Sequence, residues 1–128
     1  MNKHGKFFAF CIAFFISLLF VSCGDSYVNT IKESNFYTYT NKTIGEAVDD
    51  FFGSPEWESG DPADDELSGY KLVNCKGEIT YRDKLATAEI QFILNPDSGE
   101  FELHAFEING KPQSYNMQVE LLEAMFEE

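Results

Sequence analysis

The first 23 residues of this chain limit what the remainder can fold into. Lys3 and Lys6 precede an almost wholly apolar run over residues 7–21, and the small residue Ser22 follows it. A basic start, a short apolar stretch and a small residue at its end are the layout of a secretory signal peptide. The run is also shorter than the roughly 20 residues of a membrane-spanning helix. Removal of residues 1–22 from the 128-residue chain leaves 106 residues, enough for one small domain.

Residues 20–23, Phe-Val-Ser-Cys, resemble the lipobox of bacterial lipoproteins. In that family the cysteine thiol receives a diacylglycerol, and the lipidated cysteine becomes the first residue of the mature protein. The resemblance implies that Cys23 is a membrane anchor. Because each buried CH₂ contributes about 0.8 kcal/mol, the two or three chains it implies would hold the protein durably. Two alternatives stay open, an uncleaved N-terminal anchor and a nearby cut by an ordinary signal peptidase, and both also export the domain.

The residue after the cysteine bears on location. Gly24, rather than an aspartate, follows Cys23. In a bacterium with two membranes this resembles a lipoprotein released to the outer membrane. In a bacterium with one membrane, the protein would stay on the outer face of the cytoplasmic membrane. We therefore expect a protein of the cell envelope that faces the periplasm or the exterior.

The mature chain is strongly acidic. All 22 acidic residues follow the predicted cut, whereas Lys3 and Lys6 leave with the signal, so the formal charge changes from −13 to −15. Binding to phosphates depends on lysine and arginine, which displace counterions. Nucleic acid and anionic lipid headgroups are therefore poor partners, and we expect a basic protein partner or divalent cations instead.

Cysteine usage predicts no disulfide within the domain. Cys11 leaves with the signal and Cys23 carries the lipid, so Cys75 is the one remaining thiol. It lies within an apolar alternation that includes Val73 and Ile79, and this position predicts a small buried hydrophobic side chain. No neighbouring residue in the sequence gives a reason for a lowered thiol pKa.

The pattern after the signal predicts an α+β domain. A capping box at Thr43 and Glu46 marks the start of a helix, which ends before Gly53 and Pro55. Three extended runs, at 70–82, 85–94 and 100–108, are separated by turn sequences and predict a three-stranded antiparallel meander. Apolar residues repeat every three or four from Ser114 onward and predict an amphipathic C-terminal helix packed on one sheet face.

The same pattern predicts the organisation of the chain. Residues 1–22 are the lipoprotein signal peptide, 23–42 the lipidated N-terminus, stalk and lead-in, and 43–128 the small α+β domain. Residues 27–31 fit either a short strand or a helical turn. Residues 54–69 are rich in glycine, proline and acids, and predict a loop.

Residues 43–52 read Thr-Ile-Gly-Glu-Ala-Val-Asp-Asp-Phe-Phe, and Pro-Glu-Trp and Pro-Gln steps follow at 55–57 and 112–113. The chain from about residue 27 to 127 resembles small exported bacterial domains of uncharacterised function with this pattern. The resemblance implies an envelope lipoprotein and no particular chemistry. A helix followed by a three-stranded sheet is also similar, more distantly, to an outer-membrane assembly lipoprotein and to the β-lactamase inhibitor protein, both of which bind other proteins.

One segment supplies candidate binding residues. Trp57, the single tryptophan, lies within an acidic run, and either closes the end of the core or is an exposed aromatic anchor of the kind that dominates interfaces. The run lacks the ordered ligand spacing of an EF-hand, so it predicts a solvated loop with at most diffuse association of Ca²⁺ and no metal site. The candidate binding residues are Trp57, Glu56, Glu58, Asp61, Asp64 and Asp65, with Glu66 at the end of the run.

The sequence shows no recognisable set of catalytic residues. His104 is the one histidine after the signal, and simple alternation places it on a face with Glu102, Phe106 and Ile108. A strand histidine without a nucleophile or second ligand is most often structural or exposed. We therefore expect a non-enzymatic envelope lipoprotein without a cofactor, which binds a protein or maintains the envelope. The alternative is a secreted inhibitor or immunity-type protein that binds a basic target through the acidic loop and Trp57.

Overall fold

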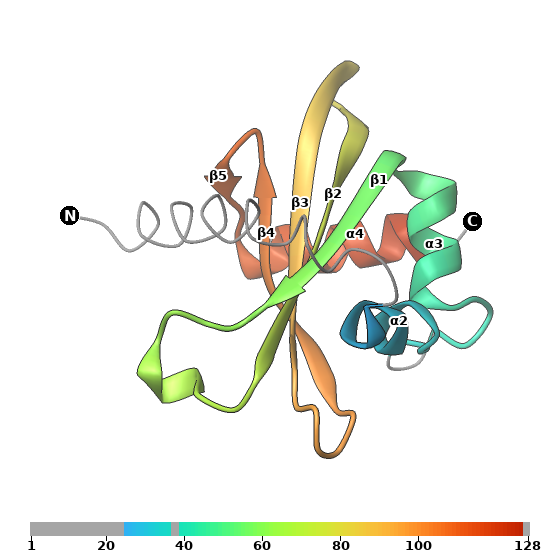
Figure 1. Ribbon diagram of the computed structural model, residues 1–128. Coiled ribbons are helices and arrows are strands. Elements are labelled where there is room, and N and C mark those ends of the chain that lie inside the picture. Colours follow the sequence, from blue (N-terminus) through green and yellow to red (C-terminus); the bar gives the residue numbers. More distant parts are fainter. Residues whose placement is uncertain (1–24, 37–38, 127–128) are drawn as a thin grey trace.

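The computed structural model describes residues 25–36 and 39–126 (Figure 1). Cys23 and the predicted signal lie outside the described residues. None of the helices within those ranges has the length and apolar character that a membrane span needs. The elements follow in the order α2 Ser26–Lys32, α3 Ile44–Phe51, β1 Gly53–Gly60, a 3₁₀ turn Asp65–Leu67, β2 Lys71–Tyr81, β3 Lys84–Leu94, β4 Phe101–Ile108, β5 Lys111–Pro112 and α4 Tyr115–Phe126.

The strands form one antiparallel sheet in the order β1-β2-β3-β4-β5, which confirms the predicted α+β class. The predicted meander corresponds to β2, β3 and β4. Its first turn lies where the sequence places it: Tyr81 pairs with Lys84 across Arg82 and Asp83, whose φ angles are 54° and 65°. Positive φ at both central residues is the signature of the two-residue type I′ hairpin turn. The sheet is larger than predicted because β1 and β5 extend it at its two edges.

β1 corrects the expectation that residues 54–69 form a loop. The first part of that segment pairs with β2, where Trp57 lies opposite Cys75. A β-bulge near the start of β1 accommodates Pro55, a residue that sheets tolerate at edges and bulges. Glycine, proline and acidic residues disfavour a strand locally, but pairing with β2 satisfies the backbone, so tertiary context decides. The true loop is shorter and covers residues 61–70.

Helix starts follow local signals. The Thr43 hydroxyl accepts a hydrogen bond from the Glu46 N–H at 3.2 Å, and the Glu46 carboxylate accepts one from the Thr43 N–H at 2.9 Å. The predicted capping box of α3 is thereby confirmed. Residues 27–31 belong to a helix, α2, because the Asp25 carboxylate accepts from the backbone N–H groups of Tyr27 and Val28. α4 confirms the predicted C-terminal helix.

The three helices pack on one face of the sheet, which we call the helix-side face (Figure 1). α2 belongs to this layer, since Val28 and Ile31 are buried in the core. Gly77 of β2 allows close packing: a Cβ there would lie 2.8 Å from Cδ2 of Phe52. The strand residues of the helix-side face are Trp57, Ser59, Lys71, Val73, Cys75, Gly77, Ile79, Tyr81, Lys84, Ala86, Ala88, Ile90, Phe92, Leu94, Phe101, Leu103, Phe106 and Ile108.

An aromatic cluster joins the segment between α2 and α3 to the sheet and to α4. Phe36 is 1% exposed, and its ring centroid lies 5.9 Å from that of Phe101, 6.2 Å from Phe92 and 6.4 Å from Phe126. Tyr39 stacks on Phe126 with the two centroids 4.9 Å apart. Aromatic pairs at these separations contribute beyond their buried area. The residues ahead of α3 therefore form part of the core.

Candidate functional site

The opposite side of the sheet, which we call the second face, carries a different set of side chains. No helix among residues 25–36 and 39–126 packs on it. Cross-strand partners point to the same face, so the register defines its members. They are Glu56, Glu58, Leu72, Asn74, Lys76, Glu78, Thr80, Leu85, Thr87, Glu89, Gln91, Ile93, Glu102, Ala105 and Glu107. This face has six carboxylates and one lysine. Leu72, Asn74, Gln91, Ile93 and Glu107 are buried, whereas Glu56, Lys76, Glu78 and Glu102 are exposed. The exposed carboxylates make this face the candidate binding surface of the domain.

Two rows of side chains cross the second face. In one row, Lys76 of β2 lies opposite Glu56 of β1 and Glu89 of β3, and Glu89 in turn lies opposite Glu107 of β4. The next row starts with Glu58, which lies opposite Asn74. Like charges placed directly opposite each other destabilise a sheet. The Glu89–Glu107 pairing is therefore unfavourable when both side chains are ionised.

Three carboxyl groups of the second face, those of Glu58, Glu89 and Glu107, have raised pKa values. Burial raises the pKa of Glu58 to about 7, the hydrogen bond from Asn74 opposes the shift, and repulsion from Glu89 adds to it. Burial, with a further contribution from Glu89, also raises the pKa of Glu107 to about 7. Burial raises the pKa of Glu89 as well, and Lys76 acts against that shift. Perturbed carboxyl groups of this kind cluster at functional sites more often than elsewhere.

These shifts predict that stability falls as the pH rises. Unfolded glutamates lose their protons near pH 4.5, whereas Glu107 in the folded domain keeps its proton up to about pH 7. Within that window the folded state binds more protons, so the free energy of unfolding decreases with pH. Urea unfolding of the full chain should show a decrease on the order of 2 kcal/mol attributable to the buried Glu107 between about pH 5 and pH 8.

Glu107→Gln isolates this effect from the general repulsion of an acidic domain. The variant should lose much of the pH dependence, and it should be more stable than the wild type at about pH 8. Glu102→Gln is the matched control, because it removes the same charge from an exposed position of the same strand. An equal pH dependence in the wild type and Glu107→Gln would contradict the assignment.

The structure does not gather all the predicted binding residues at one place. Trp57 lies on the helix-side face, half-buried against the core, with its ring centroid 6.5 Å from that of Phe92. The Lys32 ammonium sits 5.8 Å from the centre of the tryptophan ring, a cation–π contact. Glu56 and Glu58, its neighbours in sequence, point to the second face. Of its two predicted roles, this placement favours closing the core.

The remaining acids of the predicted set lie in the loop after β1. Asp61, Asp64 and Asp65 are all exposed. Asp61 forms an ion pair with Lys71, and the Asp64 carboxylate accepts a hydrogen bond from the Glu66 N–H at 2.9 Å. Within the part of the chain that the structure describes, no group of three or more His, Cys, Asp or Glu side chains is arranged to hold a metal ion.

His104 is the extra residue of a β-bulge in β4. Gln91 pairs with Ala105 and Phe92 pairs with Leu103, so His104 has no partner position on β3. The alternation that places His104 with Glu102 and Phe106 is therefore wrong, since the bulge puts these two on opposite faces. The His104 side chain is exposed.

Cys75 is buried, as its alternation predicts, with 0% of the residue exposed. Burial raises the pKa of the Cys75 thiol far above its ordinary value. The thiol is therefore protonated and unreactive at neutral pH.

Sequence reasoning missed the second face as a site. The polar alternation of Thr87, Glu89 and Gln91 along one strand is visible in the sequence. It does not show which residues of other strands lie beside Glu89. The neighbours of Glu89 are known only from the strand register. For the residues of β1, the structure was also needed to show that the segment is a strand.

Comparison of the chain with protein-family models, with curated protein sequences and with solved structures gives no match.

Proposed function

We propose that this protein is a non-enzymatic lipoprotein of a bacterial cell envelope, held in the membrane by lipid on Cys23, whose acidic domain binds a basic protein partner. The observation that supports partner binding is the second face, where the carboxylates of Glu56, Glu78 and Glu102 are exposed and Lys76 is the one lysine on that face among the described residues. A cationic surface docked there would pair with these exposed carboxylates. Complementary charge also speeds encounter and discriminates among partners.

The proposed anchor restricts how the domain is presented. α2 begins at Ser26 and contributes Val28 to the core. Only residues 24 and 25 separate Cys23 from this helix. Because an extended chain spans about 3.5 Å per residue, the start of α2 stays within roughly 10 Å of the lipidated residue. The domain would lie close to the membrane surface, within reach of partners that are themselves membrane-bound.

Photo-crosslinking in the native cells tests the proposal. A photoreactive amino acid is placed at Glu56 or Glu78, both exposed on the second face, and for comparison at Glu46 on the outer side of α3. We expect a discrete protein adduct from Glu56 and Glu78 but not from Glu46. The yield in isolated membranes should fall several-fold as salt is raised from about 0.05 M to 0.5 M, because ions screen charged contacts.

Charge reversal provides a second readout. Glu56→Lys should lower the adduct yield from a probe at Glu78, since it turns an attractive contact into a repulsive one. Asp64→Lys makes the same change in the exposed loop and should leave the yield unchanged. Adducts from Glu46 alone, or loss of binding with Asp64→Lys rather than Glu56→Lys, would assign the partner to a different surface.

A further inference from the structure

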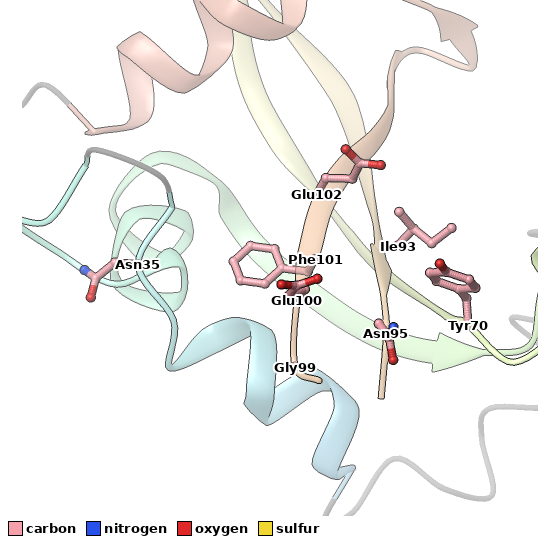
Figure 2. A pocket seen from close by; sticks show the side chains of 8 residues that line it. All are labelled: Asn35, Tyr70, Ile93, Asn95, Gly99, Glu100, Phe101 and Glu102. Carbon is pink, nitrogen blue, oxygen red and sulfur yellow. The ribbon is translucent and has the colours of Figure 1, made fainter. Parts of the chain in front are cut away.

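A cleft of about 560 Å³ lies at the end of the sheet where β3 turns into β4, and its lining extends to both sides of β4, with Asn35 and Phe101 on one side and Ile93 and Tyr70 on the other (Figure 2). The turn is closed by the Asn95 N–H, which donates to the Glu100 carbonyl at 2.8 Å, and Gly99 adopts a φ of 82°. The second-face residues Ile93 and Glu102 are cross-strand partners, and both line the cleft. Tyr70, which immediately precedes β2, forms part of its wall.

Figure 2 shows how these side chains lie around β4. Ile93 and Tyr70 lie next to each other on one side of that strand, and Glu102 extends from β4 above them. The Phe101 ring points to the opposite side, where it joins the aromatic cluster of the core. Ile93 is 7% exposed and Tyr70 is 39% exposed. The cleft therefore combines an apolar floor, an accessible aromatic ring and a carboxylate beside them.

The charge of the cleft is negative. Its lining includes the carboxylates of Glu100 and Glu102 and no lysine, arginine or histidine among the described residues. Lys71 follows Tyr70 directly in sequence, but its ammonium is held elsewhere. It forms an ion pair with Asp61 and lies 5.2 Å from the ring centre of Tyr27 of α2. Lys71 therefore does not neutralise the carboxylates of the cleft.

We propose that this cleft binds an alkylammonium or guanidinium group carried on a short apolar stem. The stem would pack on Ile93 and Tyr70, and the cation would pair with Glu102 while facing the tyrosine ring. Charge-assisted hydrogen bonds to a carboxylate and cation–π contacts to tyrosine both favour such a group. A lysine or arginine side chain of a protein and a free polyamine share this chemistry. The protein source rests on the proposed function, whereas the polyamine source does not.

Calorimetric titration of the full chain, purified in a nonionic detergent, tests the proposal. The probes are a blocked Gly-Lys-Gly peptide, the same peptide with an acetylated lysine, and spermidine. We expect saturable binding of an ammonium-bearing probe and at least tenfold weaker binding of the acetylated peptide. Binding of the lysine peptide would indicate a protein source, and binding of spermidine alone would indicate a free polyamine.

Variants locate the binding. Tyr70→Ala and Glu102→Gln change exposed side chains and should preserve the fold, which thermal unfolding monitored by circular dichroism would verify. Each should weaken binding of the cationic probe about fivefold or more. Glu120→Gln removes the same charge from the exposed surface of α4 and should have no effect. Equal binding by all variants, or by the acetylated peptide, would overturn the proposal.

The two proposals can fail separately. If Tyr70→Ala abolishes binding of the lysine peptide but leaves the crosslinks from Glu56 intact, the cleft binds a cation without contributing to the partner interface. If no crosslink forms anywhere but spermidine binds the wild type and not Tyr70→Ala, the cleft stands and the proposed partner binding does not.

Discussion

Replacement of Cys23 with serine should remove the protein almost completely from the membrane fraction, or leave it as an unprocessed precursor. Cys23 is the residue that the lipobox resemblance assigns to lipid attachment, and a thiol is required for that modification. The effect should be large because acyl chains supply most of the membrane affinity, at about 0.8 kcal/mol per buried CH₂. Membrane fractionation followed by immunoblotting measures it.

The fold should not depend on this change. The core of the described domain runs from Val28 to Phe126, all after the anchor. Thermal unfolding of Cys23→Ser should therefore match that of the wild type. Cys11→Ala, within the signal, is the matched control and should leave membrane retention intact.

Mass spectrometry of the wild-type N-terminus gives the decisive check. A lipid-sized mass increment on Cys23 with residues 1–22 absent is the expected result. An unmodified Cys23, or an intact Met1 in the membrane fraction, would refute the lipoprotein assignment and support a signal-anchored protein instead.

Phe36→Ala should be the most destabilising change within the domain. Phe36 is 1% exposed and contacts the rings of Phe92, Phe101 and Phe126. Truncation of a buried phenylalanine costs about 3–5 kcal/mol, through lost burial and the cavity left behind. Small domains have a total stability of about 5–15 kcal/mol, so a substantial fraction of the variant should be unfolded at 37 °C. Urea unfolding of the full chain measures the loss.

Leu85→Ala is the control for this prediction. Leu85 is 74% exposed, so its truncation should change the free energy of unfolding by less than about 0.5 kcal/mol. A similar, small effect of both variants would mean that the segment containing Phe36 does not contribute to the core. The result also tests whether the residues ahead of α3 fold together with the sheet.

Features that depend on near neighbours could be predicted from the sequence. The capping box of Thr43 and Glu46 spans three residues, and its hydrogen bonds form within one turn of helix. The turn at Arg82 and Asp83 and the 3.6-residue period of α4 are equally local. For the same reason the alternation around Cys75 predicted its burial.

Features that depend on pairing between distant segments required the tertiary structure. β1 is a strand because β2 lies beside it, although its own residues favour a loop. One bulged residue, His104, changes which β4 side chains reach each face, because side chains alternate with a period of two.

The candidate site depends on the same non-local pairing. Glu58, Glu89 and Glu107 lie on three different strands, and 49 positions separate the first from the last in the chain. The strand register brings them to one face. The sequence by itself determined the acidic charge, the class of fold and the candidate anchor Cys23. The tertiary structure decided where the charge is concentrated, because strand register and burial, rather than composition, set the distances between carboxylates and their pKa values.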